Sequence, residues 1–239
     1  ERRTHWPPGR YTEYSNVGSG YLGYVIEQIS GRSYEDFMRE QVLAPMGLPT
    51  ATLRADDTTL DRLAVGYDAD GQTAIPYWHM VFPPMGAINA TPLEMARLPQ
   101  FFLRRGELDG RRLLARSVID RMELPSSSLA ARAGLTYGYS LGLDQEIDGG
   151  RVWYGHHGDG DGYLSHFSYQ KDLGVGYFVT LNAFKRAALS DLKEAVRAHL
   201  AAGLEHQADS PAVTIDPSPS DRIVGDYEQH TARFERRQP

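Results

Sequence analysis

Residues 155–163 read Gly-His-His-Gly-Asp-Gly-Asp-Gly-Tyr, and no other part of the sequence is as dense in groups that can do chemistry. The flanking residues 151–154 and 164–169 are rich in β-branched and aromatic side chains, which predicts two strands joined by a glycine-rich turn. Glycines let backbone N–H groups approach a bound group without a Cβ clash. The two histidines place titratable imidazoles beside those N–H groups. We therefore expect the functional site to be built around this hairpin.

Around this hairpin the residue pattern has the period of β-strands, and short turns separate the strands, as in an antiparallel meander. Strands are predicted near residues 137–146, 150–156, 162–170 and 174–182, with turns at 148–150 and 171–174. An amphipathic helix is predicted from about residue 186 to residue 203, with its leucine and valine side chains on one face. This helix is expected to pack on the sheet.

The first half of the chain shows helix-start signals instead of alternation. Ser15 or Asn16 is predicted to cap a helix that runs to about Ser30, with apolar residues so widely spread round it that it should be buried. Further signals at residues 33–36, 91–94 and 117–120 predict three more helices. The predicted fold is α+β: a helical region, about residues 10–125, packed against an antiparallel β-sheet with a C-terminal helix, about residues 130–203.

The domain organisation is predicted from composition. We expect one domain over residues 1–205, a Pro/Ser/Asp-rich linker at 206–220 and the start of a further domain at 221–239. Residue 1 is Glu rather than Met, and residues 233–239 stop without closing an element. We therefore expect the chain to be a fragment or a processed product.

Composition excludes several classes of protein. The 239 residues are 41% hydrophobic and carry a formal net charge of −6, with no basic run outside the C-terminal tail, which argues against nucleic-acid binding. No apolar stretch approaches the length of a membrane-spanning helix. The absence of cysteine removes disulfides, thiolate catalysis and cysteine-based zinc sites, and leaves the compartment and the oligomeric state open.

The side chains of His156, His157, Asp159 and Asp161 are of the types that bind metals. Adjacent histidines on a strand face opposite ways, however, so His156 and His157 are not expected to ligate one ion together. The run 159–162, Asp-Gly-Asp-Gly, lacks the remaining ligands of a calcium loop. A solvated turn is the simpler interpretation, and no metal or other cofactor is predicted.

A second stretch of interest, Tyr14-Ser15-Asn16, precedes the first predicted helix. In an extended conformation Tyr14 and Asn16 point the same way, so a phenol that can shuttle a proton lies beside an amide that can hold a substrate carbonyl. The simpler alternative is that Ser15 or Asn16 is only a helix cap and Tyr14 a core aromatic residue. On the tripeptide alone this alternative is favoured.

The order of several motifs along the chain resembles that of a known family. The motifs are Pro7-Pro8-Gly9, Tyr14-Ser15-Asn16, Ile29-Ser30-Gly31, Ala44-Pro45-Met46-Gly47-Leu48, Met85-Gly86-Ala87, Thr91-Pro92-Leu93-Glu94 and Gly155-His156-His157-Gly158. Their order resembles the β-lactamase-related serine hydrolases, which include class C β-lactamases, DD-peptidases of the penicillin-binding type, esterases and D-aminopeptidases. The resemblance covers about residues 5–203 and rests on the motifs jointly.

This resemblance implies roles for five residues. Tyr14 and Asn16 take the family's Tyr-x-Asn positions, where the tyrosine shuttles protons and the asparagine orients the substrate. His156 and Gly158 take the His-x-Gly positions, where β-lactamases more often have Lys-Thr-Gly, and a histidine there resembles the esterase and peptidase branches. The backbone N–H of Asp159 matches one half of the oxyanion hole. Family members usually have a small residue there, so a carboxylate raises a like-charge problem beside a developing oxyanion.

The nucleophile that the resemblance implies is missing. The family has Ser-x-x-Lys at the start of a helix well upstream of Tyr-x-Asn, whereas the 13 residues before Tyr14 contain no serine. The chain has three lysines, and two of them follow a serine by three residues, in Ser168–Lys171 and Ser190–Lys193. Both pairs come after the His-x-Gly position and are interpreted as chance matches. Because upstream strands would be missing too, an apolar edge of the sheet is expected to be open.

The expected function is that of the C-terminal portion of a serine hydrolase, which acts by acyl transfer on a small-molecule or peptide substrate. A β-lactam, a D-amino peptide and a simple ester all fit, and this chain alone is expected to be inactive. One alternative is a non-catalytic binding module or assembly subunit with a degenerate pocket. Another is an α/β-hydrolase-type esterase that uses Ser140, because residues 138–142 match Gly-x-Ser-x-Gly, a motif that needs a strand before it and a helix after it. The resemblance favours a periplasmic or extracellular location.

Overall fold

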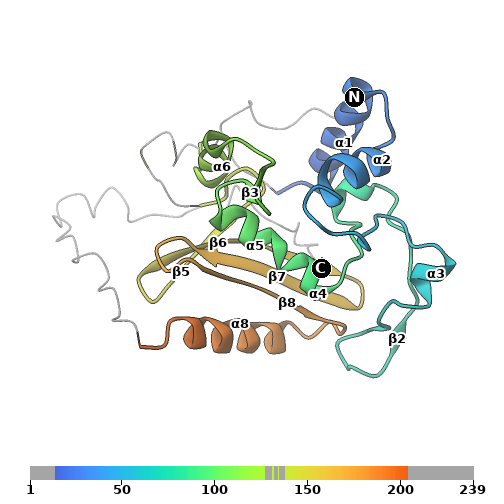
Figure 1. Cartoon of the computed structure of the whole chain (residues 1–239). Coiled ribbons are helices and arrows are strands. Elements are labelled where there is room, and N and C mark those ends of the chain that lie inside the picture. The colour runs from blue at the N-terminus through green and yellow to red at the C-terminus, as the bar shows by residue number, and fades with distance from the viewer. Residues whose placement is uncertain (1–13, 127–130, 132–133, 135–137, 204–239) are drawn as a thin grey trace, which may run out of the picture.

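A computed structural model describes residues 14–126, 131, 134 and 138–203 of the chain. Within these residues the chain has an α+β fold, with helices on both faces of an antiparallel sheet (Figure 1). The predicted linker at 206–220 and the predicted further domain at 221–239 lie outside the described residues. No helix in the described part of the chain is long and apolar enough to cross a membrane.

The largest sheet in the described residues is a meander of four strands in the order β5-β6-β7-β8. Its strands are β5, Asp144–Asp148; β6, Arg151–Gly160; β7, Tyr163–Gln170; and β8, Val175–Leu181. The predicted turns at 149–150 and 171–174 join the outer hairpins. The first strand begins at Asp144 and not near residue 137.

The stretch at 155–163 is mostly strand, which corrects the expectation of a long glycine-rich turn. β6 continues to Gly160 and β7 begins at Tyr163, so that Asp161 and Gly162 alone make the turn. Gly162 has a positive φ of 81°, a conformation that favours glycine. Both histidines of the stretch therefore lie within the β6–β7 ladder.

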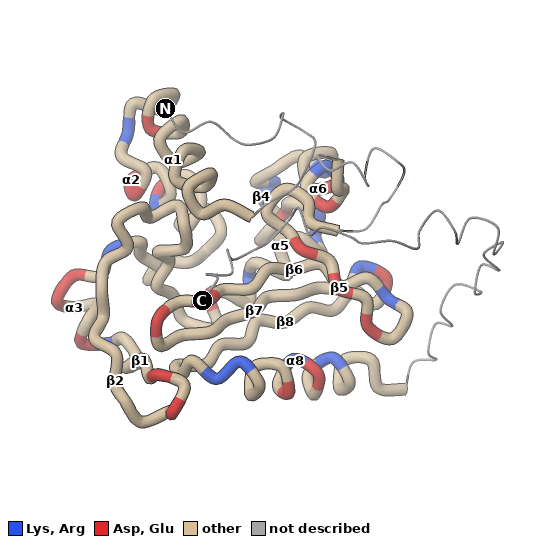
Figure 2. The backbone as a smooth tube through the Cα atoms, turned by 180° about the vertical axis from the view of Figure 1, so that it is seen from behind, with Lys and Arg blue, Asp and Glu red and all other residues tan. Residues whose placement is uncertain are grey.

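Helix α8, Arg186–Leu200, lies along one face of the sheet (Figure 1). The predicted apolar stripe is confirmed, because Leu189 is buried and Leu192, Val196 and Leu200 pack into the same cluster. This cluster includes residues from three strands: Trp153, Leu164, Tyr177 and Val179. The helix also carries charged residues of both signs along its length (Figure 2).

The opposite face of the sheet is covered by α5, Arg97–Leu103, which follows α4, Pro92–Met95. Phe102 of α5 stacks on Phe167 and Tyr169 of β7, with ring centroids 6.0 and 5.2 Å apart. Apolar residues of the helical region complete this core: Leu43, Met46, Leu48, Leu53, Leu108 and Ile119. One continuous core therefore joins the helical region to the sheet.

The rest of the helical region consists of short elements. Helix α2, Tyr34–Met38, starts at the predicted Ser33 cap and continues into a π-helical turn, η1, Arg39–Leu43. Helix α6, Arg116–Glu123, begins earlier than predicted, at an Ala115 cap that offers no side-chain acceptor. The remaining elements are α3, Asp57–Leu60; β1, Gly66–Tyr67, paired with β2, Ala74–Ile75; η2, Pro83–Met85; and β3, Glu107–Leu108, paired with β4, Arg111–Arg112.

A buried carboxylate ties α6 to the sheet. Glu123, the last residue of α6, is 6% exposed and accepts a hydrogen bond from the Tyr169 hydroxyl at 2.8 Å. It also forms ion pairs with Arg105 and Lys171. Because three donors share one carboxylate, its burial is compensated, and the end of α6 is fixed on β7.

Helix α1, Asn16–Ser30, has the predicted cap at each end. The Ser15 hydroxyl accepts from the N–H of Gly18 at 3.0 Å, and Gly31 ends the helix with a positive φ of 66°. The local signals in the sequence were therefore sufficient to define this helix.

The expectation that α1 is buried is wrong. Tyr21 is 70%, Leu22 67% and Ile29 82% exposed. The helix lies at the periphery, where its partners in the described chain are α2 and η2 (Figure 1). The wide spread of apolar residues showed that more than one face of the helix is apolar. It did not show which segment covers those faces.

The two edge strands of the described sheet differ in character. β5 carries Asp144, Glu146 and Asp148, whereas β8 reads Val-Gly-Tyr-Phe-Val-Thr-Leu and has no charged side chain. Within the described residues β8 is paired along its length with β7 alone. Among the described residues the sheet thus has an uncharged edge at β8 that pairs with no further strand, which agrees with the expected apolar edge.

Candidate active site

Strand β6 presents alternate residues to the two faces of the sheet. Tyr154 packs into the core beneath the helical region, and His156 follows it on the same face. Trp153 packs against the apolar stripe of α8, and His157 follows it there and contacts Lys193 of α8. The two adjacent histidines therefore face opposite ways, as predicted, and belong to separate environments.

Both ring nitrogens of His156 have partners. Nδ1 lies 2.6 Å from the carbonyl oxygen of His157, and Nε2 lies 3.1 Å from the hydroxyl oxygen of Tyr139. A carbonyl oxygen can only accept, so we assign the hydrogen of the neutral imidazole to Nδ1. Nε2 then has a free lone pair and accepts from the Tyr139 hydroxyl. His156 is thus arranged to take up a proton through Nε2.

The fold brings Tyr14, the first described residue, to His156 of β6, which lies far from it in the sequence. Their ring centroids are 5.8 Å apart, and the Tyr14 ring meets the Tyr139 ring edge-on at 5.9 Å. Tyr14 is 37% exposed, so one side of the group is open to solvent. We call Tyr14, Tyr139 and His156 the ring cluster. Within the cluster the Tyr139 hydroxyl oxygen and His156 Nε2, 3.1 Å apart, are within proton-transfer distance, and the Tyr14 ring packs against both of their rings.

Asn16 and Gly158 lie close to members of the ring cluster along the chain. Asn16 is the first residue of α1 and is exposed. Gly158 lies two positions after His156 on the same face of β6 and pairs with Ser165 of β7. A Cβ atom at Gly158 would lie 2.4 Å from the Ser165 hydroxyl oxygen. The Ser165 side chain therefore takes up the space beside Gly158, and a larger residue there would have to displace it.

The Asp159 side chain points away from the ring cluster. It lies on the α8 face of β6 and forms an ion pair with Arg186, the first residue of α8. The sheet thus separates its carboxylate from His156, and a guanidinium balances its charge. The like-charge problem that its sequence position raised is therefore removed.

Ser140 does not have the surroundings of a nucleophile elbow. Its hydroxyl donates to the carbonyl oxygen of Leu143 at 3.1 Å, within a turn that leads into β5. A strand follows where the elbow requires a helix. The structure therefore does not support the alternative of an α/β-hydrolase-type esterase.

The two Ser-x-x-Lys matches are also explained by structure. Ser168 is 1% exposed and donates to the carbonyl oxygen of Tyr154 at 3.2 Å, while Lys171 pairs with the buried Glu123. On α8, the ammonium of Lys193 lies 2.9 Å from Glu146. Each lysine therefore pairs with a carboxylate, and both have roles in packing the sheet.

Tyr139 is the residue of the ring cluster that sequence reasoning missed. It lies in the run 138–142, which was considered only because of Ser140. Gly138 and Gly142 have positive φ values of 138° and 74°, so glycines on both sides bend the loop that directs Tyr139 to β6. An aromatic residue between two such glycines, just before the strand that pairs with β6, was the available signal.

The β-lactamase family model matches residues 2–202 of the chain. The chain belongs to this family of serine hydrolases. Among curated members, penicillin-binding protein 4 of Amycolatopsis lactamdurans is 24% identical over 234 residues, which are 93% of this chain and 61% of that protein. A D-aminopeptidase of Cereibacter sphaeroides is 27% identical over 208 residues, which are 85% of this chain and 37% of that protein.

Solved structures agree with this assignment at the level of the fold. The crystal structure of D-alanine carboxypeptidase AmpC from Burkholderia cenocepacia superposes with a TM-score of 0.65 at 16% identity, covering 82% of this chain and 62% of that one. Because the chain spans only 61% and 37% of the two curated relatives, it corresponds to part of their length.

Proposed function

We propose that this chain supplies the tyrosine and histidine half of an acyl-transfer site, in which a serine ester of the substrate forms and is then hydrolysed. The observation that supports this proposal is the ring cluster, in which His156 offers the Nε2 lone pair to the Tyr139 hydroxyl beside the Tyr14 ring. Such a group can take the proton of an attacking hydroxyl and return it to a leaving group. Membership of the β-lactamase family supports the same class of reaction.

In the proposed reaction the serine oxygen forms a bond to the carbonyl carbon of an amide or ester. The Tyr14 hydroxyl oxygen takes up the serine proton while the hydrogen it already carries passes to the leaving amine or alcohol, whose bond to the carbonyl carbon breaks. Water then attacks the ester by the same route and releases the acid. Asn16 would orient the substrate, and the glycine at 158, which adds no side chain of its own, would let the substrate carbonyl approach the backbone of β6.

The serine and its lysine are proposed to come from a segment of the parent protein upstream of Glu1. The printed sequence has no Ser-x-x-Lys before Tyr14. The relatives named D-aminopeptidase and penicillin-binding protein support a D-amino peptide or a β-lactam as substrate, and a simple ester fits the same chemistry.

Intact-mass spectrometry tests this proposal. The 239-residue chain, and a longer product of the same gene that includes an upstream Ser-x-x-Lys, are each incubated with a β-lactam, an activated ester and a D-amino acid ester. We expect no adduct on the short chain and a stoichiometric adduct on the upstream serine of the long one. In the long product, Tyr14→Phe should slow the appearance of the adduct.

Two results would contradict the proposal. A stoichiometric adduct on Ser15, Ser140, Ser168 or Ser190 of the short chain would show that the nucleophile lies within it. A folded long product that binds these compounds in calorimetry but never becomes acylated would favour the second candidate, a binding module. That candidate is favoured by one observation, the missing Ser-x-x-Lys.

A further inference from the structure

A second group of polar side chains lies on the other face of the sheet, beneath α8. We call it the α8-face cluster, and it consists of Asp144, Glu146, His157, His166, Lys193 and Arg197. These residues come from three strands and a helix, and none of them belongs to the ring cluster. A sequence pattern within one element could not bring them together.

Two potential ligand atoms of the α8-face cluster are buried and lack a partner among the described residues. These two, Nε2 of His166 and Oδ1 of Asp144, can both bind a cation, and a third buried unpaired atom of the cluster, Nε of Arg197, is a donor and cannot. His166 is 1% exposed, and its other nitrogen lies 3.1 Å from the Tyr177 hydroxyl. Buried polar atoms in folded proteins nearly always have a partner. An unpaired imidazole nitrogen beside an unpaired carboxylate oxygen therefore points to a bound species.

The geometry of the cluster fits a metal ion. One ligand atom each from Asp144, His157 and His166 lies within 4.8 Å of the other two. Three atoms spaced in this way lie at most about 2.8 Å from a common centre, whereas zinc binds nitrogen and oxygen at about 2.0–2.2 Å. Each of the three ligand atoms therefore needs to move less than about 1 Å toward the common centre to reach the distance of a zinc ligand.

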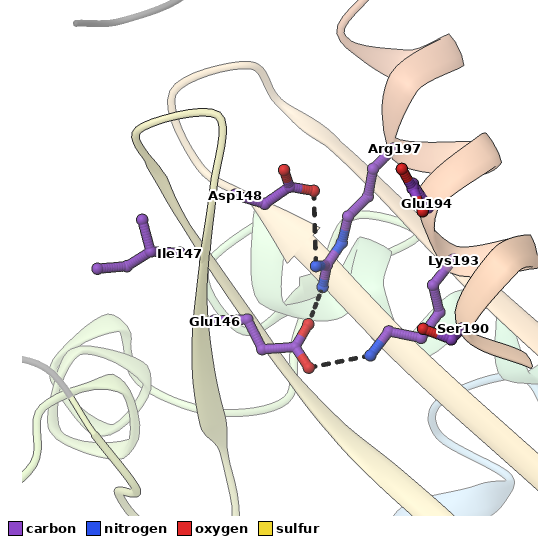
Figure 3. A pocket seen from close by; sticks show the side chains of 7 residues that line it. All are labelled: Glu146, Ile147, Asp148, Ser190, Lys193, Glu194 and Arg197. Atoms are coloured by element: carbon purple, nitrogen blue, oxygen red, sulfur yellow. Dashed lines mark hydrogen bonds and ion pairs between the residues drawn. The ribbon is translucent and has the colours of Figure 1, made fainter. Parts of the chain in front are cut away.

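The charges of the cluster leave Asp144 without a cation. Lys193 lies 2.9 Å from Glu146, and Arg197 pairs with Glu146 and lies 3.7 Å from Asp148 (Figure 3). In the described chain Asp144 forms no ion pair with a lysine or arginine, and its partner is a histidine nitrogen at 3.0 Å. If the imidazoles are neutral, the three carboxylates of Asp144, Glu146 and Asp148 are balanced by only two cations, Lys193 and Arg197. The excess negative charge lies beside the unpaired atoms.

We propose that Asp144, His157 and His166 bind a divalent transition-metal ion, for which zinc is the best match. Two imidazoles and one carboxylate are typical zinc ligands, and a water molecule can take the fourth position. His166 is 1% exposed and its Nε2 has no partner among the described residues, so this nitrogen is available to a ligated ion. The ion would join β5, β6 and β7 directly behind His156.

Metal binding requires one rearrangement. Nε2 of His157 accepts from Lys193 at 2.7 Å, and the rings of His157 and His166 stack with centroids 4.1 Å apart and 29° between their planes. Stacked rings do not direct their lone pairs at one point, so His157 has to turn away from Lys193. Lys193 then keeps its bond to Glu146. The His157 side chain is 27% exposed, which leaves it room to turn.

A pocket between β5 and α8 lies next to the cluster. The pocket is lined by Glu146, Asp148, Lys193, Arg197 and three neighbours on the same two elements (Figure 3). Glu146 and Lys193 belong both to this pocket and to the α8-face cluster. The pocket therefore borders the α8-face cluster at these residues, on the side of the sheet away from the ring cluster, although the three proposed ligands do not line it.

Metal analysis of the full chain tests the proposal. The chain, freed of any affinity tag, is loaded with Zn²⁺, dialysed against metal-free buffer and analysed for its metal content. We expect about one zinc ion per chain, bound with a micromolar or lower dissociation constant. Co²⁺ in place of zinc should give the visible absorption of a tetrahedral site.

Matched variants locate the ion. Asp144→Asn and His166→Gln each remove one ligand with little change in size, and each should weaken zinc binding by at least about 100-fold. His199→Gln changes an exposed histidine of α8 and should bind like the wild type. Lys193→Met removes the ammonium that competes for His157 and should tighten binding. Circular dichroism checks that each variant is folded.

The wild-type measurement decides the matter even if a variant fails to fold. A folded wild-type chain with far less than one zinc ion would show that a buried water molecule, or a proton on His157, satisfies the cluster, and the proposal would be overturned. Equal binding by Asp144→Asn, His166→Gln and the His199→Gln control would place the ion elsewhere and overturn it as well.

Discussion

The hydroxyl oxygen of Tyr139 lies 3.1 Å from Nε2 of His156, while Nδ1 of the same ring lies 2.6 Å from the backbone carbonyl of His157. The imidazole is therefore held between a loop that precedes β5 and its own strand. The backbone contact sets the tautomer, and the Tyr139 hydroxyl meets the nitrogen that can act as a base. This hydroxyl can be removed without altering the backbone, so its contribution can be measured.

Tyr139→Phe should impair catalysis without unfolding the protein. In the long product with Ser-x-x-Lys, we expect ester turnover to fall by about 10-fold or more, because a proton path through Nε2 loses one member. In the 239-residue chain, ¹⁵N NMR should show a changed Nε2 signal of His156 and an unchanged Nδ1–H tautomer. Tyr24→Phe, at an exposed tyrosine of α1, is the control. Equal turnover in both variants would remove Tyr139 from the proposed site.

Two glycines of β6 should respond differently to alanine. A Cβ atom at Gly155 would lie 2.2 Å from the backbone oxygen of Phe167, which cannot move without breaking the ladder. We expect Gly155→Ala to lower the free energy of unfolding by about 3 kcal/mol or more. At Gly158 the obstacle is the Ser165 hydroxyl at 2.4 Å, the end of a side chain that can rotate.

Gly158→Ala should therefore lower the free energy of unfolding by about 1 kcal/mol or less, and Ser165→Ala should restore it in the double variant. The new methyl group lies on the His156 face, so turnover by the long product should still fall. Urea unfolding and ester kinetics measure the two effects separately. If Gly158→Ala proved as destabilising as Gly155→Ala, the strand at Gly158 would not be open to a ligand.

The sheet and the helix caps could be predicted from the sequence because their causes are local. Alternation every two residues defined the meander, and Ser15, Ser33 and Thr91 each supplied the oxygen that caps a helix. Tyr14 and His156 were found through a resemblance and not through a pattern. The resemblance gave their places in the chain, and the fold then brought their rings within 5.8 Å of each other.

Other features depend on neighbours that a single sequence does not reveal. The direction of the Asp159 carboxylate depends on where β6 ends, and the sequence suggested a turn there instead of continued strand. Asp144, His157 and His166 adjoin one another only because β5, β6 and β7 pair in one particular register. The exposure of α1 depends on what packs against it, which its own residues do not encode.

Glu94 should make stability depend on pH in the acid range. Burial acts to raise the pKa of Glu94, but hydrogen bonds from Thr91 and Thr50 outweigh it and hold the pKa below its usual range. The unfolded chain therefore takes up this proton at a higher pH than the folded chain. The ionised Glu94 carboxylate therefore makes its full contribution to the free energy of unfolding above about pH 4.3, the usual pKa of glutamate. This contribution is lost as the pH falls further.

Glu94→Gln tests this dependence. Near neutral pH we expect it to lower the free energy of unfolding by about 1–2 kcal/mol, since the amide replaces an acceptor of charge-assisted bonds. At about pH 3 the difference from the wild type should be smaller. Glu107→Gln, at a surface pair with Arg112, should cost less than about 1 kcal/mol near neutral pH. If the difference in free energy of unfolding between Glu94→Gln and wild type grew as the pH fell, the pKa of Glu94 would be raised, not lowered, in the folded chain.

The uncovered faces of α1 should make the 239-residue chain associate with itself. Tyr21, Leu22 and Ile29 are each more than two-thirds exposed on this one helix, at 70%, 67% and 82%. Grouped apolar side chains of this kind favour association, whereas single ones are common on protein surfaces. We therefore expect the chain to bind a hydrophobic dye and to elute as a mixture of sizes in chromatography with light scattering.

Replacing Leu22 and Ile29 by glutamine and lysine should reduce both the dye signal and the association. Because these side chains are largely exposed, the free energy of unfolding should change by no more than about 0.5 kcal/mol per substitution. Ile147→Lys changes a side chain that is 60% exposed on β5, away from α1, and should leave association unchanged. Association that persists in the α1 variants would point instead to the uncharged edge of β8, where a charged residue at Thr180 should then abolish it.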